Sequence, residues 1–268
     1  MNTQTNQYKG HPVLAEYSYD VQSVERGYTG STLYVNLSEN TIVAKPVTAQ
    51  MKETFIGGRG FGLWLLWNAV QDDTRWDDPE NEINIASGPL GGTTHFPGSG
   101  KSLVVGISPL TGSVMDSNVG GYFGPLLKFS GWDALEIQGK AVQEIMVVID
   151  GDAGKVLILE AQDELRNTHP VGQQLTELLA DTDAERPGIS VVSAGTGAEH
   201  SRMGCLNFSW YDVRRKTPRF KQAGRGGLGT VLRDKRIVAV VVKQTGVRGD
   251  SNHPADRERI STDRKSVV

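Results

Sequence analysis

Runs of apolar or alternating residues follow one another along most of this 268-residue chain, with few helical stretches between them. Consecutive strands favour antiparallel pairing, whereas a doubly wound parallel sheet needs a helix after nearly every strand. The pattern therefore predicts an α+β domain with antiparallel sheets. Strands are expected at 32–38, 40–47, 82–87, 102–108, 134–139, 144–150, 155–160, 188–194 and 236–243, and helices at 121–130, at 170–181 and after the glycines of 57–62.

Glycine is dense, with 32 residues that gather at 57–62, 88–100, 106–124 and 224–229. Such clusters let main chain approach a ligand closely or adopt a positive φ, and they also serve ordinary tight turns. Four separate clusters favour a ligand-binding surface.

Charge and composition exclude several classes of protein. A net charge of −3, from 28 basic and 31 acidic residues, gives no overall field for nucleic acid or an anionic membrane. No run of 18 apolar residues and no apolar leader are present, so we expect a cytoplasmic protein without a membrane partner. The single cysteine, Cys205, can neither form an internal disulfide nor hold an iron–sulfur cluster alone, and it is expected to be buried and inert.

No catalytic group or protein-only metal site is predicted. The histidines show none of the spacings typical of metal ligands, and no convincing acid, base or nucleophile stands out, so the catalytic residues are expected outside this chain. The histidines are His11, His95, His169, His200 and His253.

Two glycine-rich strings imitate nucleotide-binding motifs. In "HFPGSGKS", His95 occupies the first glycine position of a phosphate-binding loop, and a strand rather than a helix follows Lys101. "GRGGLG" at 224–229 matches the dinucleotide fingerprint, but basic and polar residues at 214–223 precede it where a hydrophobic strand belongs. Neither string predicts a nucleotide site.

Local features nevertheless suit an anion. Positive side chains lie beside the glycines of 224–229, which fits a phosphate-bearing ligand or an ordinary solvated loop. Asn118 precedes a Gly-Gly pair and an expected helix, which fits an anion, a metal-bound phosphate or simply an Asn-capped turn. The positive residues are Arg214, Arg215, Lys216, Arg219, Lys221 and Arg225.

Five strings together resemble the N-terminal domain of the aldehyde ferredoxin oxidoreductase family, which are tungsten- or molybdenum-pterin enzymes. The resemblance covers about residues 28–245 in family order. It implies two mainly antiparallel sheets with a few helices, which form a base for a bis-pterin cofactor. The strings are "FIGGRGFGLWLL", "IASGPLGGT", "SGKSLVVGISPLTG", "DSNVGGYFGPLLKFSGWDALEIQGKA" and "AGRGGLGTVLRDKRIVAVVV".

The resemblance also implies a cofactor site in which magnesium bridges the pterin phosphates. Asn118 and Gln222 fall on positions that contact magnesium. Lys101 and Lys221 stand where the family often has Arg, so the charge is kept without the planar fork. The implied cofactor-binding residues are Lys101, Asn118, Gly120, Lys221, Gln222, Gly224 and Arg225.

The function implied is the tungstopterin-binding part of an oxidoreductase that converts aldehydes to carboxylates and passes electrons to ferredoxin or an iron–sulfur subunit. One alternative is the tungsten subunit of a class II benzoyl-CoA reductase, because the segment 204–227 is long as in the bacterial branch. Another is a non-catalytic cofactor-binding or assembly module. Family members are more than twice as long, form oligomers at full length, and carry the [4Fe–4S] ligands and substrate pocket in later domains.

Both ends of the chain are set apart from the resemblance. Residues 1–27 show no clear period and are expected to be an N-terminal arm. Residues 246–268 also lack an apolar period, and "DRKSVV" is similar to a translated sequencing adapter. They are interpreted as a truncated or foreign tail.

Overall fold

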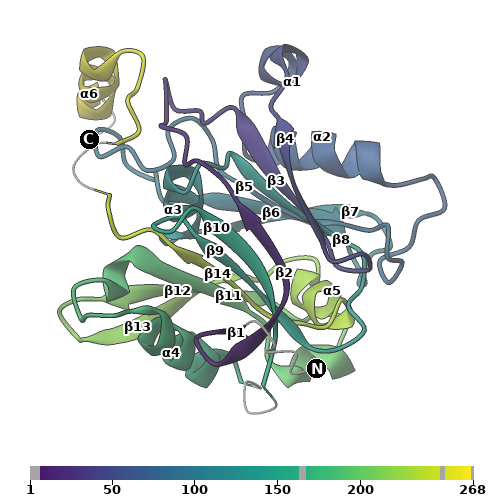
Figure 1. Cartoon of the computed structure of the whole chain (residues 1–268). Coiled ribbons are helices and arrows are strands. Elements are labelled where there is room, and N and C mark those ends of the chain that lie inside the picture. The colour runs from purple at the N-terminus through teal and green to yellow at the C-terminus, as the bar shows by residue number, and fades with distance from the viewer. Residues whose placement is uncertain (1–6, 163–166, 248–250, 267–268) are drawn as a thin grey trace.

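The computed structural model describes residues 7–162, 167–247 and 251–266, whose strands form two sheets that face one another (Figure 1). Most neighbouring strands are antiparallel, with parallel pairing at β3–β8 and β9–β14, which confirms the α+β prediction. The first sheet has the order β1 (Gln7–Tyr8), β2 (His11–Ser18), β10 (Lys155–Glu160), β9 (Ile145–Asp150), β14 (Ile237–Lys243), β11 (Ile189–Ser193), β12 (Leu206–Asp212) and β13 (Thr217–Ala223). The second has the order β4 (Thr41–Pro46), β3 (Ser31–Asn36), β8 (Ala134–Gln138), β5 (Ile83–Ala86), β6 (Ser102–Ile107) and β7 (Val114–Val119).

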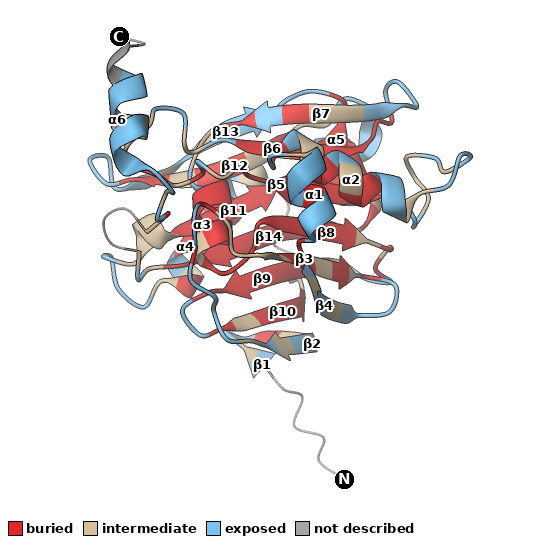
Figure 2. Cartoon of the chain, turned by 90° about the horizontal axis from the view of Figure 1, so that it is seen from above, coloured by how far each residue is buried: buried red, intermediate tan, exposed pale blue. Residues whose placement is uncertain are grey.

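Helices cover the outer faces of the sheets and fill the space between them. α2 (Arg59–Ala69) packs on the second sheet and α4 (Thr168–Leu179) on the first, so the central strands are buried on both faces (Figure 2). α3 (Phe123–Phe129) and α5 (Leu228–Asp234) lie between the sheets. The other helices are α1 (Ala49–Thr54), α6 (Arg257–Ser266) and the 3-10 turns Arg186–Gly188 and Thr196–His200. None of the described helices is long and apolar enough to cross a membrane.

The N-terminal residues differ from the expected arm. Within the described part of the N-terminal segment, strand β2 pairs antiparallel with β10 and extends the first sheet. Most of its side chains are only half-buried, because the strand lies near a sheet edge, and its sequence therefore shows no clear period.

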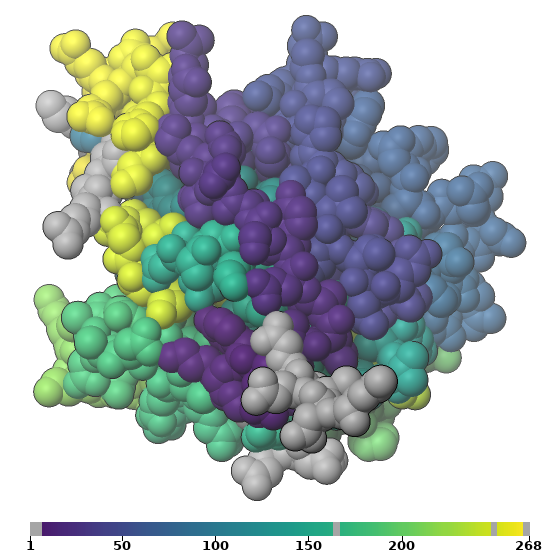
Figure 3. All heavy atoms as spheres, in the orientation of Figure 1, coloured from purple at the N-terminus to yellow at the C-terminus, as the bar shows by residue number. Residues whose placement is uncertain are grey.

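The C-terminal residues lie against the N-terminal part of the chain (Figure 3). The N–H of Gly27 donates to the carbonyl of Asn252 at 3.2 Å, and Nδ1 of His253 lies 2.9 Å from the carbonyl of Val24. The interpretation of residues 246–268 as a truncated or foreign tail stays a prediction.

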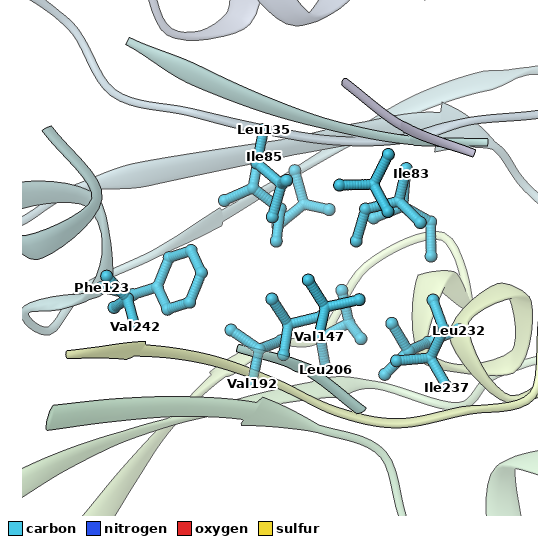
Figure 4. Close-up of a cluster of buried hydrophobic side chains, with 14 of the residues drawn as sticks. Ile83, Ile85, Phe123, Leu135, Val147, Val192, Leu206, Leu232, Ile237 and Val242 are labelled. Atoms are coloured by element: carbon cyan, nitrogen blue, oxygen red, sulfur yellow. The ribbon is translucent and has the colours of Figure 1, made fainter. Parts of the chain in front are cut away.

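The main core lies between the two sheets. Ile83, Ile85 and Leu135 of the second sheet face Val147 and Val242 of the first, and all five are fully buried (Figure 4). Each such side chain contributes about 1.5–3 kcal/mol when it leaves water. Continuous apolar strands are needed here because helices cover the opposite faces, and this explains why the sequence shows them as unbroken apolar runs.

The outer face of the second sheet buries two carboxyl groups beneath α2. Glu136 accepts hydrogen bonds from Thr32 Oγ1 at 2.5 Å and Lys45 Nζ at 2.7 Å. Glu82, which is 1% exposed, accepts one from Asn84 Nδ2 at 3.1 Å. Burial, and secondly the charge of Glu136, raises the pKa of Glu82 from 4.5 to about 7.

A pH dependence of stability follows for Glu82. Because its pKa is raised in the fold, the folded protein binds more protons than the unfolded chain between pH 4.5 and 7, and stability falls as pH rises through that range. We expect Glu82→Gln to raise the free energy of unfolding by about 3 kcal/mol at pH 8 and by far less at pH 4. Urea unfolding at both pH values measures this, with the exposed Glu39→Gln as control. Equal effects at the two pH values would contradict it.

Candidate functional site

The edges of the two sheets meet where β7 and β13 end. The N–H of Arg225, just after β13, donates to Oγ of Ser117 in β7 at 3.0 Å. Both strands lie on the same side of the molecule, opposite β1 and β2 (Figure 2). The ends of β7 and β13 carry six of the seven residues that the resemblance assigned to cofactor binding, and Lys101 directly precedes β6, the neighbour of β7.

Lys101 is brought to the C-terminal end of β7 by contact between glycine main chains. A Cβ on Gly100 would lie 2.3 Å from the carbonyl oxygen of Gly121, so only glycine permits this approach. Gly226 packs against a side chain instead, since its Cβ would lie 2.3 Å from Cγ of Met115. These two contacts join the loop before β6 and the turn after β13 to the two ends of β7.

Other glycines leave main chain open. Cβ atoms built on Gly120 and Gly224 would meet nothing within 4 Å. Their peptide groups therefore have no side chain of their own in front of them, and a ligand can approach them. Open main chain beside positive side chains is the donor set that a phosphate group needs, and the residues present fit a phosphate-bearing cofactor.

The positive side chains at this edge are exposed and come from four segments. Arg59, at the start of α2, was missed by the sequence reasoning, although the glycine cluster 57–62 was a signal for it. Its Nη2 lies 2.9 Å from Oδ2 of Asp116 in β7. The exposed cations are Arg59, Lys101, Arg219, Lys221 and Arg225.

Strand pairing decides which faces the polar side chains take. Asn118 pairs with Leu103, whose side chain lies 3.7 Å from a Cβ built on Gly58, and thus points to the α2 face of its sheet. Gln222 donates from Nε2 to Oδ1 of Asn207 at 3.3 Å, on the α4 face of the other sheet. The two side chains proposed for magnesium therefore do not converge, and a shared ion there would require main-chain oxygens. Lys221 pairs with Phe208 and takes the inner face.

Two local features of this region differ from what the sequence suggested. The Asn-capped turn, one of the alternatives for Asn118, does not describe this residue, because Asn118 lies in strand β7 and the N-cap of α3 is Tyr122. Residues 217–223 form strand β13 despite their basic, polar sequence, because an edge strand keeps one face in water.

The string "GRGGLG" at 224–229 still does not form a dinucleotide-binding site, for a steric reason. A Cβ on Gly227, the N-cap of α5, would lie 2.1 Å from the carbonyl oxygen of Arg202, so the protein's own main chain covers this helix start. The strand that follows Lys101 is confirmed as β6, which excludes the phosphate-binding loop of ATPases. Cys205 is half-buried and unpaired rather than fully buried.

The sequence as a whole matches one family. The family model described as "Aldehyde ferredoxin oxidoreductase, N-terminal domain" matches residues 32–244. The chain belongs to the aldehyde ferredoxin oxidoreductase family. The resemblance read from the five strings is thereby confirmed.

Several relatives are tungsten enzymes. The tungsten-containing aldehyde ferredoxin oxidoreductase of Pyrococcus horikoshii is 32% identical over 221 residues, which cover 81% of this chain and 33% of that protein. The WOR-like subunit of the aliphatic sulfonate oxidoreductase of Pyrococcus furiosus is 27% identical over 239 residues, covering 82% of this chain and 35% of that protein. The chain thus spans about a third of the length of these relatives.

A solved structure shares the fold. The BamBC active-site complex of benzoyl coenzyme A reductase, in complex with 1,5-dienoyl-CoA, aligns with a TM-score of 0.69 and 27% identity. The alignment covers 83% of this chain and 32% of that one. The relatives and the neighbour named here are oxidoreductases.

The glycine contact at Gly100 makes a prediction about folding. We expect Gly100→Ala to lower the free energy of unfolding by about 1–3 kcal/mol, because the added methyl group overlaps main chain that cannot move aside cheaply. Gly120→Ala is the matched control, with a Cβ in open space and a change within about 0.5 kcal/mol. Urea unfolding of the chain measures both, and equal midpoints for the two variants would refute the contact.

Proposed function

We propose that this chain is the cofactor-cradling part of a tungsten-dependent oxidoreductase that converts aldehydes to carboxylates and delivers the electrons to ferredoxin. The observation that carries the proposal is the meeting of the β7 and β13 edges, where open glycine main chain lies among exposed cations. The names of the relatives supply tungsten, aldehyde and ferredoxin.

Side chains and main chain would each contribute to binding a bis-pterin group. Lys101, Lys221 and Arg225 provide positive charge for its phosphates, and Gly120 and Gly224 provide peptide N–H groups without a side chain in the way. Magnesium between the phosphates would be met by main-chain oxygens near Asn118 and Gln222, because their side chains take different faces. A tungsten bis-pterin group supplies two-electron redox chemistry when bound.

The overall reaction sets what the rest of the enzyme must provide. Oxidation of RCHO with H2O yields RCOO⁻, two electrons and three protons. The sequence of this chain has a single cysteine, so a [4Fe–4S] cluster that takes the electrons one at a time needs ligands from further domains. Substrate-binding and proton-transfer residues are likewise proposed outside this chain.

A second function is favoured by the benzoyl-CoA reductase neighbour. With 27% identity and a TM-score of 0.69, the BamBC complex supports the alternative that the full protein is the tungsten subunit of such a reductase. The complete gene product distinguishes the two: turnover of simple aldehydes with ferredoxin supports the first, and reaction only with aromatic coenzyme A thioesters supports the second.

Arg225 tests the cofactor site. In the complete gene product, we expect Arg225→Ala to reduce tungsten and pterin per polypeptide roughly tenfold, because a charge-assisted hydrogen bond contributes about 1.5–3 kcal/mol. Metal analysis by mass spectrometry and pterin fluorescence after oxidative release measure the loss.

Arg214→Ala is the control, because it removes the same charge at the other end of the β12–β13 hairpin, in the turn between the two strands. We expect this variant to keep the tungsten content of the unaltered protein. Circular dichroism checks that both variants fold. Equal tungsten in the Arg225→Ala and Arg214→Ala variants would remove Arg225 from the site.

A further inference from the structure

Residues 87–101, here named the Lys101 loop, connect β5 to β6 and end at Lys101. Two buried side chains hold main-chain carbonyls at the start of this loop. Nζ of Lys128, in α3, donates to the carbonyl of Gly88 at 2.5 Å and to that of Gly27 at 2.7 Å. Nδ2 of Asn252 donates to Pro89 at 2.9 Å and to Gly91 at 2.7 Å.

Both donors lie where water cannot replace them, since Lys128 and Asn252 are each 0% exposed. Burial lowers the pKa of Lys128 to about 8, and the charge of Asp133 opposes this shift. A buried ammonium is costly unless its protons are used. An apolar residue in its place would remove the side-chain donor of Gly27 and leave the carbonyl of Gly88 with only the N–H of Gly91. The role of Lys128 is therefore to donate hydrogen bonds.

Three distant parts of the sequence converge at this point. A Cβ on Gly27 would lie 2.2 Å from the carbonyl oxygen of Pro89, so the segment before β3 touches the loop directly. Gly27 also donates its N–H to the carbonyl of Asn252. The C-terminal residues lie beside the N-terminal ones in Figure 3.

The same helix supports the other end of the loop. A Cβ on Gly124 of α3 would lie 2.5 Å from Oγ of Ser102 and 3.3 Å from the carbonyl oxygen of Lys101. The loop closes on itself through a hydrogen bond from Gly92 N–H to the carbonyl of Ser99 at 2.9 Å. With its start held and Gly92 bonded to Ser99, the loop has little freedom, and Gly100 stays beside Gly121.

We propose that Lys128 and Asn252 are positioning residues that fix the Lys101 loop, and with it Lys101, at the anion site. Asn252 comes from the segment after the last strand, so the site is completed by residues beyond the two sheets. This rests on the proposed function for the nature of the anion, while the mechanical role of the two residues stands on the hydrogen bonds alone.

Amide hydrogen exchange of the 268-residue chain tests the mechanical role. The amides of Gly91, Gly92 and Lys101 donate within the loop and report on it. We expect Lys128→Met to speed their exchange about tenfold or more, because the loop loses the charged donor at Gly88 and the Gly27 segment that touches Pro89 loses its own. Asn252→Leu should act in the same direction, and it serves where Lys128→Met does not fold.

Lys235→Met is the matched control. Lys235 is also a buried lysine with a pKa lowered by burial to about 8, and it donates to the carbonyls of Pro79 and Gly139 at 3.3 and 2.9 Å, away from the Lys101 loop. Its replacement should loosen the amide of Gly139 and leave those of the loop unchanged. An equal increase throughout the chain for Lys128→Met, or unchanged loop amides, would overturn the proposal.

Tungsten content of the complete gene product provides the second readout. Lys128→Met and Asn252→Leu should lower it about tenfold, and Lys235→Met should not, if the loop positions Lys101 for the cofactor. A loosened loop with unchanged tungsten would overturn the positioning role. Absence of tungsten from the unaltered protein would instead refute the proposed function, with hydrogen exchange still deciding whether the two residues hold the loop.

Discussion

The close approach of glycine main chain to the two ends of β7 is the constraint on which the site depends. Two sheets that pack face to face share a core, but nothing in that packing alone brings their edges together. Here Gly100 lies against the main chain of Gly121 and Gly226 against the side chain of Met115, at distances that a Cβ on either glycine would prevent. Peptide groups and cations from separate segments are thereby gathered into one surface.

An exposed edge strand can pair with another chain, and this offers a second explanation for the positive charge on β13. Lysine and arginine on an edge strand discourage pairing with other chains, and Arg219 and Lys221 on β13 would serve that purpose without any ligand. Lys101 and Arg225 lie outside the strands, where edge protection does not account for them. The ligand-binding interpretation therefore rests more on these two residues than on the charge of β13.

The sequence predicted the buried strands well because strands covered on both faces are continuous apolar runs, as in β9 and β14. The sequence did not predict β7 and β13, where one face meets water and the residues are polar. It also did not predict β12, although the apolar residues Leu206, Phe208 and Trp210 alternate there. The site residues could be named only from the family resemblance. Their convergence depends on the strand order, and the faces taken by Asn118 and Gln222 depend on register, which no local pattern specifies.

The buried polar groups of the Lys101 loop could not be predicted for a related reason. Lys128 lies in an otherwise apolar helix and Asn252 in a polar tail, and neither shows a partner in sequence. Apolar packing alone can position a strand or a helix, because the main-chain N–H and C=O groups there are already hydrogen-bonded. An irregular loop has unpaired carbonyls, and burying them requires donors from elsewhere. A loop that must hold a cation in one place at the edge of an apolar core thus needs buried polar side chains, even at the cost of desolvating a lysine.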